Sequence, residues 1–373
     1  MAPAHAREPA ANERIARARV AVAAAGADAL LIPASADFRW LTGAHARATE
    51  RLLVLVLPRS AAPWCVVPAL EAEAMAAECP WLTLEVWKDG EDPMTRLAGG
   101  LSLETRPSLL LGEGFRTGVL LELAARAACR PGAPVLAPLR ATKDAAEVAR
   151  MEAAGRHADQ VMAEAAAMLR PGLTEREVAQ FILARFEALG DHDPWAIVAS
   201  GPNSAFPHHM TSSRALVEGE VVLLDLGAYH QGYGSDITRT FWLGRPPAEF
   251  ERVYAIVNEA RAAGIAAAKP GAPAAAVDAA ARGVIERAGY GERFLHRTGH
   301  GVGLEIHEPP YLAPGNEAPL AAGMTHSVEP GIYLPDRFGI RLEDLVVIEP
   351  SGGRPLNHAP FAPAGGAPQQ VAG

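Results

Sequence analysis

A chain of 373 residues is long enough for two domains, and a hydrophobic content of 49% provides material for a sizeable core. The formal net charge is -9 and Lys and Arg form no cluster, which argues against binding to nucleic acid. No run of about 18 apolar residues occurs, so we expect no segment that crosses a membrane.

The N-terminal segment has the composition of a secretory signal peptide, because arginines precede an Ala/Val-rich stretch. Gly26 and Asp28 interrupt the apolar run, however, and Glu13 lies among the arginines. We therefore predict a surface helix followed by a strand at 29–32. Three scattered cysteines without close spacing indicate free thiols in a reducing compartment, the cytoplasm: Cys65, Cys79 and Cys129.

Residues 1–140 alternate short apolar runs with helical patterns, which predicts a small α/β domain with a mixed sheet. This domain has no pair of acids at metal-ligand spacing, so we expect it to cover a site or support assembly. The expected strands lie at 52–57, 64–67, 82–87 and 108–111, and the expected helices at 69–78 and 118–128.

Two capping-box patterns, Asp144 with Glu147 and Thr174 with Glu177, open helices after a domain boundary near residue 140. We predict a second domain at 141–350 and a mobile Pro/Gly/Ala-rich tail at 351–373. The expected helices are 144–169, 174–190, 250–270 and 273–289, and the expected strands are 197–199, 221–226, 237–242, 302–306, 325–328 and 342–348.

The second half of the chain also aligns with an earlier stretch of itself. An offset of 99 pairs His208 with His307, an offset of 104 pairs Asp225 with Glu329, and a further slip of three pairs Asp236 with Glu343. Two related αβ units that face each other would bring these acids and imidazoles to one centre. Such a centre suits a hydrolase that uses two metal ions.

Two aspartates are expected to meet across a hairpin. Asp225 follows the apolar run VVLL, where a buried carboxylate costs several kcal/mol unless it is paired or bound to metal. Asp236 lies beyond a Tyr/Gly/Gln-rich turn, and Thr238 shares its strand face and is expected to hold its carboxylate. Two adjacent anionic groups repel each other unless a cation lies between them.

A glycine-rich segment, GHGVGLEIHE at 299–308, supplies His300 and His307. Three glycines in five residues argue against a helix, so an extended backbone is expected to bring both rings to one site. His208 is the repeat partner of His307, and we prefer it to His209, which should point the other way on an extended segment.

Three further residues belong to predicted strands: Glu329 ends one just before Pro330, and Arg341 and Glu343, two residues apart, project from the same strand face. Each alone fits a turn residue or a surface ion pair, but the internal repeat favours a shared site. Four carboxylates and one imidazole form an oxygen-rich donor set that suits Mn²⁺ or Co²⁺, with Zn²⁺ or Fe²⁺ as alternatives. The predicted ligands are Asp225, Asp236, His300, Glu329 and Glu343.

The motifs around these residues resemble the pita-bread metallopeptidases, and among them prolidase (Xaa-Pro dipeptidase) and aminopeptidase P. The matching motifs over residues 140–350 are VVLLDLGA, GSDITRTF, GHGVGLEIHE, VEPGIY and GIRLED, and SGPNSAFPHH at 200–209 also belongs to the pattern. ADALLIPASADFRWLTG resembles the creatinase-type N-terminal domain. The resemblance implies an α+β chain: a C-terminal pita-bread fold with a pseudo-two-fold αβ repeat after a smaller α/β creatinase-like domain.

The resemblance further implies two divalent metal ions. Asp225, Asp236 and Glu343 would hold one ion, and Asp236 and Glu343 would bridge to a second ion held by His300 and Glu329. A hydroxide between the ions would attack the carbonyl that precedes proline in an Xaa-Pro dipeptide, with Glu329 as the proton acceptor.

The same resemblance assigns substrate roles to three further residues. His208 and His307 would position the substrate and stabilise the oxyanion or relay a proton to the proline nitrogen, and Arg341 would orient a carboxylate. The expected partners are a small peptide with proline second and another copy of the chain in a homodimer, with no nucleic acid and no membrane.

Four alternatives accompany this hypothesis. Aminopeptidase P acts on longer peptides, and HEPPY after the second histidine favours a dipeptidase without deciding the question. Methionine aminopeptidase usually lacks an N-terminal domain of this size, and creatinase works without metal. A non-catalytic peptide-binding scaffold would be expected to have lost ligands, whereas all five are present here.

Overall fold

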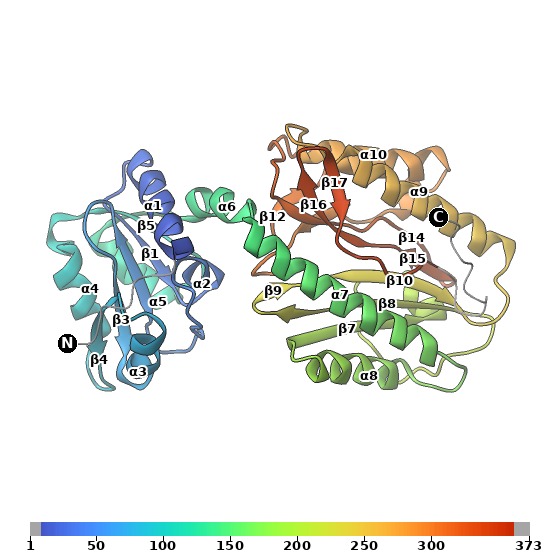
Figure 1. Cartoon of the computed structure of the whole chain (residues 1–373), viewed down its shortest axis with the longest axis horizontal. Helices are drawn as coiled ribbons and strands as arrows, with labels where there is room; N and C mark the ends of the chain where they lie inside the picture. Colours follow the sequence, from blue (N-terminus) through green and yellow to red (C-terminus); the bar gives the residue numbers. More distant parts are fainter. Residues whose placement is uncertain (1–8, 362–373) are drawn as a thin grey trace. The chain divides into compact units, whose positions relative to one another are not determined.

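A computed structural model describes residues 9–361 and divides the chain into two compact units, Met1–Arg140 and Ala141–Gly373 (Figure 1). We propose that these units are the two domains. Among the described residues no helix is both long enough and apolar enough to pass through a bilayer.

The first unit contains a six-stranded sheet in the order β4-β3-β2-β1-β5-β6 with helices around it. Parallel and antiparallel neighbours both occur, so the predicted mixed sheet is confirmed. The strands are β1 (Ala29–Pro33), β2 (Val54–Pro58), β3 (Trp64–Pro68), β4 (Thr83–Trp87), β5 (Ser108–Leu111) and β6 (Ala128–Pro131). The helices are α1 (Pro9–Ala24), α2 (Ala36–Thr42), α3 (Ala69–Glu78), α4 (Pro93–Leu101), η1 (Leu103–Thr105), α5 (Thr117–Arg126) and α6 (Ala133–Ala141).

The predicted N-terminal helix exists as α1. Ile15, Ala18 and Val22 are buried at three- and four-residue spacing, so one stripe of the helix packs inward while the arginines face outward or pair with backbone carbonyls. The sequence did not reveal α2, α4, α6 or β6, which are short.

The second unit contains four long helices around three sheets. The helices are α7 (Ala145–Met168), α8 (Glu175–Ala188), η2 (Gly201–Ala205), α9 (Ala248–Ala267), α10 (Ala274–Arg287) and η3 (Gly291–Arg293). The strands are β7 (His192–Ser200), β8 (Val221–His230), β9 (Tyr233–Gly234), β10 (Ile237–Trp242), β11 (Gly299–Gly301), β12 (Glu308–Leu312), β13 (Thr325–Val328), β14 (Gly331–Leu334), β15 (Phe338–Arg341), β16 (Asp344–Glu349) and β17 (Gly352–Pro355).

Both predicted capping boxes are present. Asp144 and Glu147 exchange hydrogen bonds with each other's backbone amides at the start of α7, and Thr174 and Glu177 do so at the start of α8. Each box satisfies two backbone donors that a helix end otherwise leaves free, which is why the sequence located these helix starts accurately.

The internal repeat is visible in the backbone pairing. The segment before α8 contacts the segment before β8, and the segment before α10 contacts the segment before β13 in the same way. The equivalent contacts are Thr174 with Ala215 and Pro273 with Pro319, and Gly172 with Leu216 and Gly271 with Leu320. These pairs keep the offsets of 99 and 104 found in the sequence, so the predicted pseudo-two-fold arrangement is confirmed.

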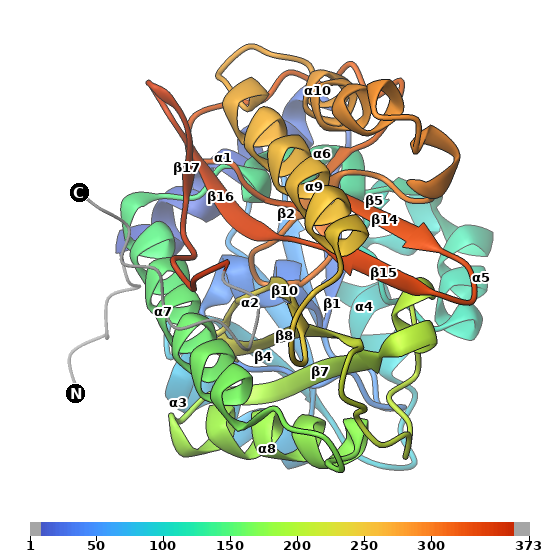
Figure 2. The ribbon, with the colours of Figure 1, turned by 90° about the vertical axis from the view of Figure 1, so that its right-hand side faces the viewer.

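The four helices lie on the outside of this unit, with α7 and α8 on one side and α9 and α10 on the other (Figures 1 and 2). The first pair packs on the sheet β10-β8-β7, where Val161 and Ile182 join Leu224 and Leu226 in one apolar core. Alternation along β8 therefore sends its even-numbered residues to the helices and its odd-numbered residues, Asp225 among them, to the opposite face.

Two predictions about local structure differ from the fold. Residues 302–306 form a bent loop between β11 and β12 instead of a strand, and the β11–β12 register already shifts between His300 and Gly301, just before this loop. The predicted tail from residue 351 begins with β17, which pairs with β16, and Ala359 is buried. Residues 362–373 lie outside the described part of the chain.

Candidate active site

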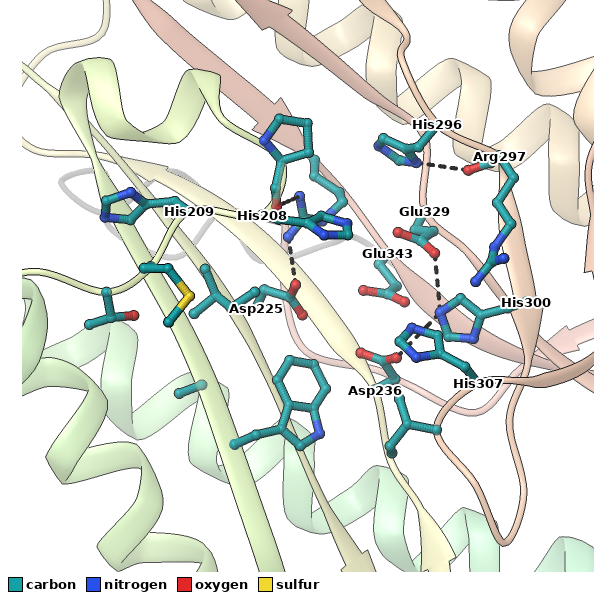
Figure 3. Close-up of a pocket in the computed structure, with 18 residues that line it drawn as sticks. His208, His209, Asp225, Asp236, His296, Arg297, His300, His307, Glu329 and Glu343 are labelled. Atoms are coloured by element: carbon teal, nitrogen blue, oxygen red, sulfur yellow. Dashed lines mark hydrogen bonds and ion pairs between the residues drawn. The ribbon is translucent and has the colours of Figure 1, made fainter. Parts of the chain in front are cut away.

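A cavity of about 1020 Å³ in the second unit is lined by all the residues that the sequence selected as ligands or catalytic groups. Figure 3 shows the carboxylates of Asp236, Glu329 and Glu343 directed toward the ring of His300, with Asp225 facing them across the same space. The residues of the cavity come from strand ends or linkers in both halves of the internal repeat. The fold therefore brings together residues more than 100 positions apart in the sequence. The selected residues are His208, Asp225, Asp236, His300, His307, Glu329, Arg341 and Glu343.

The predicted hairpin brings the two aspartates together. Antiparallel β8 and β10 place Asp225 directly opposite Thr238, two residues after Asp236. The expected role of Thr238 is wrong, however, because its hydroxyl donates to Glu343 at 2.6 Å instead of to Asp236. Strand alternation identified the face correctly, but the partner comes from the other half of the repeat, which local spacing does not reveal.

Asp236, His300 and Glu343 each offer an atom within 4.8 Å of the other two. The Nδ1 atom of His300 donates to the carbonyl of Gly301 at 3.1 Å, because a carbonyl oxygen can only accept. The Nε2 atom therefore faces the acids, 3.2 Å from Glu329 and 3.8 Å from Asp236. Metal-binding histidines are typically fixed by such a bond from the other ring nitrogen.

These acids are buried close to one another, so nearby positive charge would stabilise their ionised forms. Burial and the neighbouring carboxylates raise the pKa values of Asp236 and Glu343 well above their usual values, and burial also raises the pKa of Asp225. The Oδ1 atom of Asp225 is buried without a hydrogen-bond partner in the part of the chain that the structure describes. Four acids and the Nε2 atom of His300, which faces them, therefore fit divalent cations. Such ions would neutralise the repulsion between the carboxylates.

Glu329 differs from the other acids. Burial alone would raise its pKa, but the contact with His300 and the positive charges around it lower the pKa to about 2. Its carboxylate is consequently ionised throughout the neutral range, which suits either a metal ligand or a proton acceptor.

Arg341 balances the charge of Asp225 and connects this acid to Tyr333, which the sequence analysis did not single out. Its guanidinium lies 2.5 Å from Asp225 and also donates to the hydroxyl of Tyr333 at 3.0 Å. The Tyr333 hydroxyl is also 2.8 Å from the Nε2 atom of His296, and burial raises the pKa of Tyr333 to about 12. Neutral Tyr333 thus holds Arg341 in place without adding charge.

His208 and His307 line the cavity wall, where their side chains remain accessible from the cavity. The His307 ring lies 4.2 Å from that of His300 between centroids, and burial together with His300 and Arg297 lowers the pKa of His307 to about 4. His307 is therefore neutral at pH 7. His209 lies 2.9 Å from Glu175 and points away from His208 in Figure 3, in line with the expected alternation.

The sequence did not single out two basic residues of the cavity, His296 and Arg297. They stand just before the glycine-rich segment that supplies His300. The guanidinium of Arg297 lies 4.5 Å from the centroid of the Tyr311 ring, and it forms no ion pair with any residue that the structure describes.

A buried histidine beneath the site, His326 on β13, makes the metal-free protein sensitive to acid. Its Nδ1 atom donates to the Ser327 carbonyl, and burial lowers its pKa to about 4 from an unfolded value near 6.5. The unfolded chain binds this proton first, so stability falls as pH drops from 6.5 to 4.

We expect His326→Asn to reduce this loss in the free energy of unfolding by up to roughly 3 kcal/mol, because asparagine retains a hydrogen-bond donor but does not titrate. Urea unfolding of chelator-treated protein across this pH range measures the effect. His358→Asn, which alters an exposed histidine, is the control, and equal pH profiles for wild type and His326→Asn would contradict the prediction.

The fold and the grouped donors define a metal-dependent hydrolase, and comparisons with known proteins identify its family. Residues 149–350 match the model described as Metallopeptidase family M24, and residues 14–107 match the Creatinase/Prolidase N-terminal domain. The chain therefore belongs to metallopeptidase family M24, whose members use divalent metal ions.

Individual relatives agree with this assignment. The Mycobacterium tuberculosis protein named "Probable dipeptidase PepE" is 41% identical over 364 residues, which cover 93% of this chain and 94% of that protein. An Xaa-Pro dipeptidase of Pyrococcus horikoshii is 36% identical over 334 residues, covering 88% and 92%. The solved prolidase of Thermococcus sibiricus superimposes with a TM-score of 0.89 at 36% identity, covering 94% of this chain and 98% of that one.

Proposed function

We propose that the protein hydrolyses the bond before proline in Xaa-Pro dipeptides, with two divalent ions held by Asp225, Asp236, His300, Glu329 and Glu343. The convergence of these five donors in one cavity carries the proposal. When bound, the ions would lower the pKa of water and so supply hydroxide near neutral pH. The oxygen-rich donor set favours Mn²⁺.

The residues of the chain have separate roles in this reaction. Glu329 is ionised and accepts a proton from the attacking water. His208 and neutral His307 stand on the cavity wall, where an N–H donor stabilises the negative charge on the carbonyl oxygen or passes a proton to the proline nitrogen. Arg341 keeps Asp225 oriented toward the metal position.

Arg297 favours dipeptides over longer peptides. A dipeptide places its free carboxylate one residue beyond the scissile bond, whereas a longer peptide has a neutral amide there. The other cavity arginine, Arg341, is already paired with Asp225, but the charge of Arg297 faces only the ring of Tyr311 among the described residues. A free cation in the cavity wall suits a carboxylate.

The test compares an Xaa-Pro dipeptide with an Xaa-Pro-Xaa tripeptide after reconstitution with Mn²⁺. We expect Arg297→Met to lower kcat/KM about 10- to 100-fold for the dipeptide, the effect of losing a charged hydrogen bond, and to leave the tripeptide rate within about threefold. Arg293→Met, at a nearby exposed arginine outside the cavity, is the matched control. Wild-type preference for the tripeptide would instead establish an aminopeptidase.

The proposal includes a homodimer in the cytoplasm. The free thiols of Cys65, Cys79 and Cys129 suit a reducing compartment. Phe206 and Met210, which are 62% and 84% exposed beside the cavity, offer apolar surface that a second copy would cover. Light scattering of the purified protein tests the dimer directly.

A further inference from the structure

A second group of metal-binding side chains lies outside the cavity. His157 projects from α7, Asp191 directly precedes β7, and His230 is the last residue of β8. None of the three lines the cavity, and the proposed hydrolysis does not use them.

The alternation of β8 separates this group from the catalytic centre. Leu224, Leu226 and Ala228 pack in the core beneath α7 and α8, and His230 continues this even-numbered series. Asp225 belongs to the odd-numbered series on the opposite face. His230 is therefore on the helix-covered side of the sheet, where His157 of α7 meets it.

The three side chains already have the close geometry of a ligand set. The Nδ1 atom of His157 lies 2.9 Å from one oxygen of Asp191, and the Nδ1 atom of His230 lies 2.8 Å from the other. The two rings are edge to face, with centroids 4.6 Å apart. Ligand atoms around tetrahedral zinc lie roughly 3.3 Å from one another, so small rotations of these rings would admit an ion.

The charge balance at Asp191 also favours a cation. Its side chain is 2% exposed, and within the described residues only the two imidazoles lie within ion-pair distance of it. A buried carboxylate is costly unless it is hydrogen-bonded, paired or bound to a metal, and a cation held between the two rings would supply the opposite charge. The His157 and His230 side chains are 25% and 19% exposed, which leaves a path for water as a fourth ligand.

We propose that His157, Asp191 and His230 bind one zinc ion that fastens helix α7 to the sheet of β7 and β8. Two imidazoles with one carboxylate select zinc-like transition metals, in contrast to the oxygen-rich donors of the catalytic centre. The ligands come from three elements that are separated in sequence, so the bound ion stabilises the folded chain and has no direct part in hydrolysis.

Zinc content of the full-length protein tests the site. Chelator-treated protein is equilibrated with Zn²⁺ alone at pH 7.5, freed of excess metal and analysed by mass spectrometry. We expect His157→Gln and His230→Gln each to retain one equivalent less zinc than wild type, and to lose part of the zinc-dependent rise in Tm. With Mn²⁺ loaded instead, both variants retain wild-type kcat/KM.

His192→Gln is the matched control, because His192 is a half-buried neighbour that pairs with exposed Asp193 outside the group. It should bind as much zinc as wild type. A crystal of the wild-type protein soaked in Zn²⁺ gives an independent readout that requires no variant to fold: anomalous density among the three side chains supports the site. Equal zinc content in all variants, or no density there, would mean that the group is held by hydrogen bonds alone.

Discussion

Asp236→Asn is expected to lower kcat/KM for an Xaa-Pro dipeptide by at least about 10³-fold after incubation with Mn²⁺. Asp236 shares a common centre with His300 and Glu343, which come from the other half of the repeat, and this placement suits the proposed ligand shared by two ions. Asparagine supplies one neutral oxygen in place of two charged ones, which removes several kcal/mol of charge stabilisation. Bound manganese should fall from two equivalents per chain at the same time.

The same substitution is expected to stabilise the metal-free protein. Burial and the charges of Glu343 and Asp225 raise the pKa of Asp236 well above its usual value. Such a group stabilises the fold only while protonated, so this contribution is present below the unfolded pKa of about 4 and is lost as pH rises toward the native pKa. At pH 7 asparagine removes the repulsion, and thermal unfolding in chelator should show a higher Tm than wild type.

Asp278→Asn is the control for a buried aspartate outside the centre. Asp278 pairs with Arg282 and accepts hydrogen bonds from Thr298, so its loss should lower Tm and leave the manganese content unchanged. Wild-type rates in Asp236→Asn would contradict the assignment of Asp236 as a ligand. Lower activity with two ions still bound would reassign it to substrate binding.

The sequence predicted most of the catalytic domain because its signals are local or periodic. The capping boxes located α7 and α8, and the apolar run before Asp225 located β8. The repeat then supplied long-range information that a single sequence rarely contains. Matching acids and histidines at offsets of 99 and 104 implied that the two halves face each other, and the cavity contains the residues selected on that basis.

The sequence did not predict side-chain contacts between helices and strands that are far apart in the chain, because no rule of residue spacing relates such elements. Thr238 bonds Glu343 across the repeat, and Tyr333 reaches Arg341 and His296 from a neighbouring hairpin. The group of His157, Asp191 and His230 has no motif, since it forms where a helix crosses the end of a sheet. Such contacts depend on side-chain directions after packing, which single-sequence periodicity does not determine.

The position of His208 is fixed by its two neighbours. The carbonyl of Pro207 accepts a hydrogen bond from Arg341 at 3.3 Å, and the ring of His209 lies against Glu175. Burial alone would raise the pKa of Glu175, but hydrogen bonds from Ser212 and other neighbours lower it to about 2, so this anchor stays charged. The loop therefore presents the His208 ring to the cavity from a fixed backbone (Figure 3).

His208→Ala is consequently expected to lower kcat about 10²- to 10⁴-fold while both manganese ions remain bound, because the proposed role of the ring is to act on the substrate and His208 is not among the grouped metal donors. His208→Gln distinguishes its two possible roles. Glutamine retains an N–H donor but does not exchange protons near neutral pH, so partial recovery of kcat indicates stabilisation of the oxyanion, and no recovery indicates proton transfer. Loss of metal from His208→Ala would show instead that His208 is a ligand.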